Sequence, residues 1–265
     1  MIDIHAHVNF PNFDADRAEV MTRALASGVG MINVGTDLET SKSAVTLAHE
    51  YENDSVWATV GIHPTDINDQ LDWVEFKKLA QDKKVVAIGE CGLDYFHVKD
   101  PGEREKQKEF FLKQIVIAGE VGKALMIHCR PSLGTQDAYL DLLTILQSNS
   151  SHFAKATRDR PGDLHFFVGS LEIAKQFLAL GFTLSFTGVI TFTHDYDEVI
   201  KITPLEQIMA ETDCPFVAPA PYRGKRNEPS YVAEVVKRLA EIKGISFDDM
   251  ATQTVTTARR VFNLP

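Results

Sequence analysis

The feature that most restricts the fold of this chain is a regular alternation of apolar, β-rich runs with segments of helical period along its 265 residues. Such alternation is typical of repeated strand–helix units, which build a parallel sheet. The eight expected strands cover, approximately, residues 1–7, 30–35, 57–61, 85–90, 124–128, 164–168, 183–186 and 207–211. The expected helices cover residues 14–27, 40–52, 70–81, 103–121, 136–147, 171–180, 195–201, 229–243 and 248–262.

Such units can close into a barrel or form an open, doubly wound sheet. The open sheet normally carries a Gly-rich phosphate loop after its first strand, whereas here that strand ends in His5 and His7. We therefore expect an α/β fold with one domain over residues 1–265, a TIM-type (β/α)8 barrel with an extra C-terminal helix. Ser246, with Asp249 three residues on, predicts a capped start for the last helix.

Composition and charge exclude several classes of protein. The chain has no apolar run long enough for a membrane helix, and its three cysteines cannot form a disulfide framework, so we expect a cytoplasmic protein with no membrane partner. A formal net charge of -10 argues against a surface that wraps nucleic acid widely, although metal ions or a small basic cluster can still recruit it locally. The polar segment 147–163 is expected to be a surface insertion, and we assign it no function.

Six side chains that commonly bind metals are expected at the mouth where the strands end. His5 and His7 occupy alternate positions of the first strand, so both side chains point to the same face. The other four lie at or just after the ends of later strands: Glu90, His128, His165 and Asp213. Buried charges need partners, and divalent cations are the simplest ones for this nitrogen and oxygen set. A carboxylate between two groups of histidines can also bridge two ions.

Cys91, Cys129 and Cys214 each directly follow one of these candidate ligands. Alternation along a strand turns neighbouring side chains to opposite faces. We therefore expect the thiols to point toward the surrounding helices as small buried hydrophobic groups, and not to bind metal.

Several longer motifs extend this pattern along the chain. They are Asp3-Ile4-His5-Ala6-His7, Gly61-Ile62-His63-Pro64, Gly89-Glu90-Cys91-Gly92-Leu93-Asp94-Tyr95, Ile127-His128-Cys129-Arg130, His165-Phe166-Phe167-Val168-Gly169, Glu211-Thr212-Asp213-Cys214-Pro215 and Arg223-Gly224-Lys225-Arg226-Asn227-Glu228-Pro229. With them the chain resembles the TatD-like metal-dependent deoxyribonucleases of the amidohydrolase superfamily over essentially its whole length.

The resemblance implies two divalent ions that share Glu90. His5, His7 and Asp213 would complete one site, and His128 and His165 the other. It also implies a hydrolase acting on ester bonds, an exonuclease that digests single-stranded DNA or DNA ends, with Mg²⁺ or Mn²⁺ as working ions and Zn²⁺ as a further possible bound ion. No obligate protein partner is expected.

Two ions at such a site would activate a shared water. We therefore expect Asp213 to accept a proton from that water while Glu90 bridges the two ions. Candidate substrate contacts are His63, Arg130, Arg223 and Lys225, because guanidinium groups match phosphate oxygens and the segment after the eighth strand is where barrels often bind phosphate. A capping role for His63 and a solvated loop at Lys225 remain open.

Pro131 and Phe166 depart from the residues common in the family at those positions, which leaves the choice of substrate open. One alternative keeps the dinuclear site in an amidase, esterase or deacylase, because a fold does not determine a reaction. Another is a non-catalytic, metal-stabilised binding protein.

Overall fold

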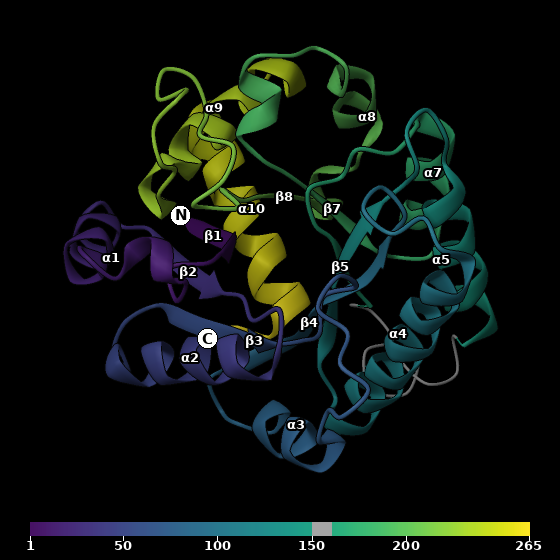
Figure 1. Cartoon of the computed structure of the whole chain (residues 1–265). Coiled ribbons are helices and arrows are strands. Elements are labelled where there is room, and N and C mark those ends of the chain that lie inside the picture. The colour runs from purple at the N-terminus through teal and green to yellow at the C-terminus, as the bar shows by residue number, and fades with distance from the viewer. Residues whose placement is uncertain (150–160) are drawn as a thin grey trace.

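A computed structural model of the chain describes residues 1–149 and 161–265 (Figure 1). All eight strands lie in one parallel sheet, and each strand pairs with the next one along the chain. The strands are β1 (Ile2–Ala6), β2 (Gly30–Asn33), β3 (Val56–Val60), β4 (Val85–Asp94), β5 (Ala124–Arg130), β6 (Gly162–Leu164), β7 (Thr183–Phe186) and β8 (Ile208–Ala210). The sheet has the topology of a TIM barrel, which confirms the expected fold class.

The barrel closes through the segment that follows β8 rather than through β8 itself. Ala6 and Cys214 form an isolated parallel bridge. The Asp213 N–H donates to the His5 carbonyl at 2.9 Å, and the His7 N–H donates to the Cys214 carbonyl at 2.9 Å. These bonds bring the end of β1 together with Asp213 and Cys214 of the segment after β8, at the mouth of the barrel.

Helices surround the sheet in the order expected (Figure 1). They are α1 (Arg17–Ala26), α2 (Leu38–Glu50), α3 (Trp73–Ala80), α4 (Pro101–Val121), α5 (Asp137–Ser148), α7 (Leu171–Ala179), α8 (Asp197–Ile202), α9 (Val232–Lys243) and α10 (Phe247–Phe262). Short 3-10 turns are η1 (Pro11–Phe13), η2 (Gly188–Thr191), η3 (Leu205–Gln207) and η4 (Pro229–Tyr231). Ser246 caps α10 as expected, because its hydroxyl accepts the Asp249 N–H at 3.1 Å.

Most strand and helix bounds agree with expectation within a few residues, but β4 runs on to Asp94 and β6 ends early. It ends at Leu164, so the strand predicted over residues 164–168 is wrong. Phe166 has a φ of 46°, a left-handed conformation that breaks the extended ladder. Within the predicted insertion 147–163, Ser148 ends α5 and Gly162 starts β6, and residues 150–160 lie outside the described part of the chain.

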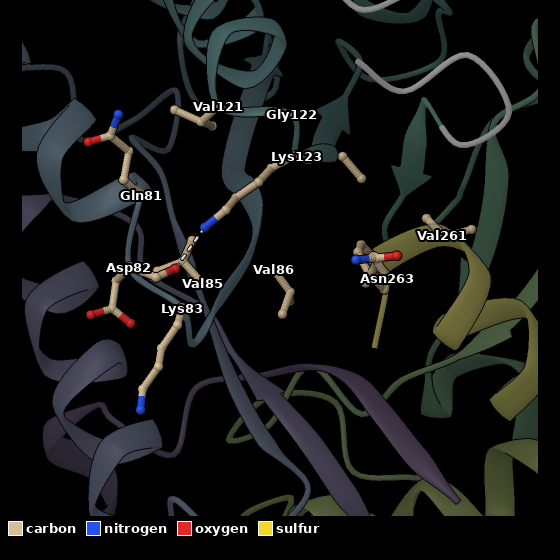
Figure 2. Close-up of a pocket in the computed structure, with 12 residues that line it drawn as sticks. Gln81, Asp82, Lys83, Val85, Val86, Val121, Gly122, Lys123, Val261 and Asn263 are labelled. Atoms are coloured by element: carbon tan, nitrogen blue, oxygen red, sulfur yellow. Dashed lines mark hydrogen bonds between the residues drawn. The ribbon is translucent and has the colours of Figure 1, made fainter. Parts of the chain in front are cut away.

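The end of α10 packs on the N-terminal ends of the strands. Val261 and Phe262 belong to a buried cluster with Ile2, Ala124 and Met126. A cavity of about 320 Å³ lies beside this contact, lined by the first residues of β4 and β5 and by the end of α10 (Figure 2). It is therefore at the opposite end of the barrel from the residues that follow the strands. In the described residues, no helix has the length and apolar character to cross a bilayer.

Candidate metal centre

Five strands, β1, β4, β5, β6 and β8, and the residues just after them deliver the candidate ligands to the mouth. His5 lies on β1 and His128 on β5, while Glu90 lies within β4. Gly61, just after β3, makes room for Glu90, because a Cβ there would lie 2.1 Å from the Gly89 carbonyl carbon and 2.4 Å from the Glu90 nitrogen. His165 is the first residue after β6 rather than part of it, as a consequence of the early end of that strand.

One oxygen of Glu90 faces the histidines of the first strand. Glu90 Oε2 lies 3.4 Å from His5 Nε2 and 3.8 Å from His7 Nε2, and these two ring nitrogens are 3.1 Å apart. Asp213 Oδ1 lies 3.4 Å from His7 Nε2 and 3.9 Å from His5 Nε2. Two imidazoles and the Asp213 carboxylate thus converge on the Oε2 side of Glu90.

The other oxygen of Glu90 faces a second group of imidazoles. Glu90 Oε1 lies 2.9 Å from His128 Nδ1 and 2.9 Å from His165 Nε2. His63 Nε2 is 3.5 Å from the same oxygen, and its ring meets the His128 ring edge-on at 4.3 Å. The sequence left His63 open between a substrate contact and a capping role, and the structure brings its ring nitrogen to Glu90 beside two candidate ligands.

The Glu211 carboxylate lies beside the rings of His165 and His5, on the side away from Glu90. Its Oε2 lies 3.3 Å from His165 Nδ1 and 3.7 Å from His5 Nδ1, while the Nε2 atoms of both rings face Glu90. Its Oε1 accepts the Phe166 N–H at 2.5 Å and the Ser185 hydroxyl at 3.1 Å. A carboxylate on the outer nitrogen of a histidine is the usual way to fix the orientation of a metal ligand.

The remaining rings have outer partners of the same kind. His128 Nε2 lies 3.1 Å from Asp94 Oδ2, and His7 Nδ1 lies 3.1 Å from the Val34 carbonyl oxygen. His63 Nδ1 is 2.7 Å from the Thr65 hydroxyl. The outer nitrogens of His7, His128 and His165 thus lie beside oxygen acceptors, whereas His63 Nδ1 accepts the Thr65 N–H at 3.2 Å.

Burial and charge act against each other in this cluster. Burial alone would raise the pKa of the Glu90 carboxyl, but the His165 and His63 rings outweigh it and hold that pKa well below its usual range. Burial alone would lower the pKa of His165, yet the Glu90 and Glu211 carboxylates raise it well above the usual value. For His63, burial and the nearby His128 ring lower the pKa to about 3. The rings and carboxylates of this cluster therefore shift one another's pKa values strongly.

The donor set fits divalent metal ions. In the described residues, three sets of side chains have ligand atoms that all lie within 4.8 Å of one another: His5, His7 and Glu90; His63, Glu90 and His128; His5, His165 and Glu211. His5 Nδ1 is buried without a hydrogen-bond partner. Buried imidazoles and carboxylates without compensating cations are unfavourable, and nitrogen with oxygen ligands suits zinc, manganese and iron.

The three thiols lie where alternation along the strands predicts. Cys91, Cys129 and Cys214 are buried in the apolar cluster between the sheet and the helices. Burial raises the pKa of each thiol, which keeps it protonated. They are hydrophobic packing groups, as expected.

Basic side chains lie on the segments beyond the mouth. Arg130 ends β5 and stacks on Phe96, with Cζ 4.0 Å from the ring centroid, and Arg223 stacks on Phe192 at 3.6 Å. Both guanidinium groups are exposed and make no ion pair within the described residues. The side chain of Lys225 is exposed as well.

Arg226, unlike these two arginines, forms an ion pair. Its Nη2 lies 2.6 Å from Asp16 Oδ2, and its Cζ is 4.4 Å from the centroid of the Phe13 ring. This side chain therefore ties the segment after β8 to the start of the chain.

Several acidic residues of the site escaped the sequence analysis. Glu211 and Asp94 entered that analysis only as members of longer motifs. Asp163 is also buried, and burial with the nearby Glu211 carboxylate raises its pKa to about 7. A signal was present, because Asp163 and Glu211 each stand two residues before a candidate ligand and so share its face.

Comparison with known proteins shows the family of the chain. The family model for TatD-related DNases matches residues 2–263. An uncharacterized metal-dependent hydrolase of Bacillus subtilis, YabD, is 40% identical, covering 100% of this chain and 99% of that protein. The 3'-5' ssDNA/RNA exonuclease TatD of Escherichia fergusonii is 31% identical, covering 100% and 99%. The crystal structure of the TatD homologue YjjV from Escherichia coli superimposes with a TM-score of 0.84 at 28% identity, covering 100% and 98%.

The family model spans nearly the whole chain, and the relatives match it end to end. The histidines and carboxylates around Glu90 form a set that can bind metal ions. This chain is a metal-dependent hydrolase that belongs to the TatD-related DNase family.

Proposed function

We propose that this chain is a deoxyribonuclease that removes nucleotides from the ends of single-stranded DNA with the help of two divalent ions. The observation that carries the proposal is the division of the candidate ligands between the two oxygens of Glu90. His5, His7 and Asp213 would hold one ion with Oε2, and His128 and His165 the other with Oε1. The name of the Escherichia fergusonii relative supports the substrate class.

Bound ions would supply an acidified water and would polarise the phosphoryl oxygens. Asp213 is the group best suited to accept the proton of that water. Its side chain is 13% exposed, against 6% for Glu90, so it borders the opening of the site. Its φ of 54° gives the segment after β8 a sharp turn. The water oxygen would bond to phosphorus as the bond from phosphorus to the sugar oxygen breaks.

The stacked arginines are suited to bind phosphate. The guanidinium groups of Arg130 and Arg223 rest on phenylalanine rings and keep their N–H donors available. A planar guanidinium donates two parallel hydrogen bonds to phosphate oxygens. We assign both to the phosphates that flank the cleaved bond, with Lys225 as a weaker, longer-range contact.

The test is hydrolysis of an end-labelled single-stranded oligonucleotide by the purified protein with Mg²⁺ or Mn²⁺. We expect stepwise shortening that EDTA stops and that His128→Ala and Asp213→Asn abolish. Glu206→Gln, at an exposed carboxylate before β8, is the matched control and should keep full activity. Hydrolysis of an ester or amide panel with no shortening of DNA or RNA would overturn the proposal in favour of another reaction at the same centre.

A further inference from the structure

Exposed phenylalanines are concentrated on the loops that follow the strands. Among the described residues, the exposed Phe side chains are Phe96 after β4, Phe192 after η2, Phe216 after β8 and Phe247 at the start of α10. The first three therefore lie on the side of the barrel where the metal centre forms. Single exposed apolar residues are common, but aromatic rings grouped around one site often mark a binding surface.

Phe216 is directly adjacent to the centre. Its ring is 48% exposed, and its centroid lies 6.3 Å from that of the His7 ring in an edge-to-face arrangement. Phe216 is also three residues beyond Asp213, and its N–H donates to the Asp213 carbonyl at 2.9 Å. A planar group that stacks on this ring would lie beside the candidate ligands of one ion.

The turn that presents Phe216 is held rigidly. The side-chain amide of Asn227, which is fully buried, donates to the Thr212 carbonyl at 2.8 Å and to the Phe216 carbonyl at 2.7 Å. Val217 has a φ of 46°, which is unfavourable for a β-branched residue. Strain of this kind persists where the surrounding structure fixes it, and it often accompanies a functional role. The backbone that carries the exposed ring is thus held in place.

The surface charge favours a stacking contact over a purely ionic one. The net charge of -10 works against binding a polyphosphate chain by charge alone. Stacking of a nucleobase on a neutral aromatic ring does not depend on that charge, and every base has a face to stack. A duplex hides those faces, whereas a single strand exposes them.

We propose that Phe216 stacks on an unpaired nucleobase next to the cleaved bond and thereby makes the enzyme selective for single-stranded nucleic acid. The inference rests on the proposed nuclease function. It adds a group that contacts the unpaired base, which the metal centre itself does not do.

The experiment compares cleavage of a single-stranded oligonucleotide with that of the same strand in which an abasic residue replaces the terminal or the penultimate nucleotide. The wild-type enzyme should cleave the intact strand about five times better or more, measured as kcat/KM, since stacking of one base is typically worth at least that factor. Phe216→Ala should lose this preference through KM, with kcat and abasic cleavage unchanged. Phe216→Trp should keep the preference.

Phe247→Ala is the matched control, because that ring is 39% exposed on α10, the helix that covers the other end of the barrel. An unchanged preference for the intact strand in Phe216→Ala would overturn the stacking role while leaving the nuclease function standing. Cleavage of neither strand by the wild-type enzyme would contradict the nuclease function, and the stacking role with it.

Discussion

The clearest consequence of the geometry concerns Glu211, which is hydrogen-bonded to the outer nitrogen of His165 and lies near that of His5. Glu211→Gln removes the charge beside His165 Nδ1 at 3.3 Å and His5 Nδ1 at 3.7 Å, while the side chain keeps its size. Loss of an outer partner typically weakens metal binding about 10- to 100-fold, or about 1.4 to 2.7 kcal/mol. Because Glu211 contacts rings on both sides of Glu90, we expect the upper part of that range.

The assay is titration calorimetry of the metal-free protein with Mn²⁺, alongside circular dichroism to confirm the fold. Glu206→Gln makes the same chemical change at an exposed site before β8 and should leave the affinity unchanged. Ser185→Ala removes the hydroxyl that contacts Glu211 Oε1 at 3.1 Å and Asp163 Oδ2 at 2.5 Å but keeps the Glu211 charge, and it should weaken binding by a few fold at most. A Glu211→Gln protein that folds and binds Mn²⁺ within about twofold of wild type would refute the orienting role assigned to this carboxylate.

Three further predictions follow from other parts of the molecule. Arg223→Ala should raise the KM for DNA at least about fivefold with little change in kcat, because the guanidinium is assigned to phosphate; an unchanged KM in steady-state kinetics would contradict that assignment. Asn227→Ala should lower the free energy of unfolding by about 1 to 3 kcal/mol in urea titrations, since one buried and one part-buried carbonyl lose their donor; a loss within experimental error would show that they find other partners. Lys123, whose amine donates to the Asp82 carbonyl in the cavity of Figure 2, has its pKa lowered by burial from 10.5 to about 8. Between those pH values the unfolded chain binds more protons than the folded protein does. The free energy of unfolding of the wild type should therefore rise with pH relative to that of Lys123→Met. We expect a rise of about 1 kcal/mol, because the amine is partly exposed. A stability difference that does not change from pH 7 to 10.5 would contradict this.

Much of the fold was predictable because its signals are local. The expected bounds of β7 agree with the structure residue for residue, and those of α7 and α10 agree to within one residue. The left-handed backbone at Phe166 shortens β6. Nothing in the sequence indicates this conformation, because Gly is the residue that usually adopts it and Phe occupies the position. Pairing with β5 as far as Arg130 extends β4 to Asp94, four residues past its predicted end.

The centre itself was only partly predictable. Strand period and position lead to His5, His7 and Glu90, because these residues repeat at the ends of apolar runs. The contacts that orient the rings depend on how strands far apart in the chain meet, as where Glu211 from the end of β8 reaches His165 after β6. The same holds for Asn227, whose bonds to the turn after β8 could not be inferred from its place in a loop.

The central claim is that Glu90 lies between two divalent ions. The most direct test is anomalous diffraction from crystals of the protein soaked in Mn²⁺. We expect two peaks about 3.5 to 4 Å apart, one near His5, His7 and Asp213 and the other near His128 and His165. A single peak, or peaks away from Glu90, would contradict the account.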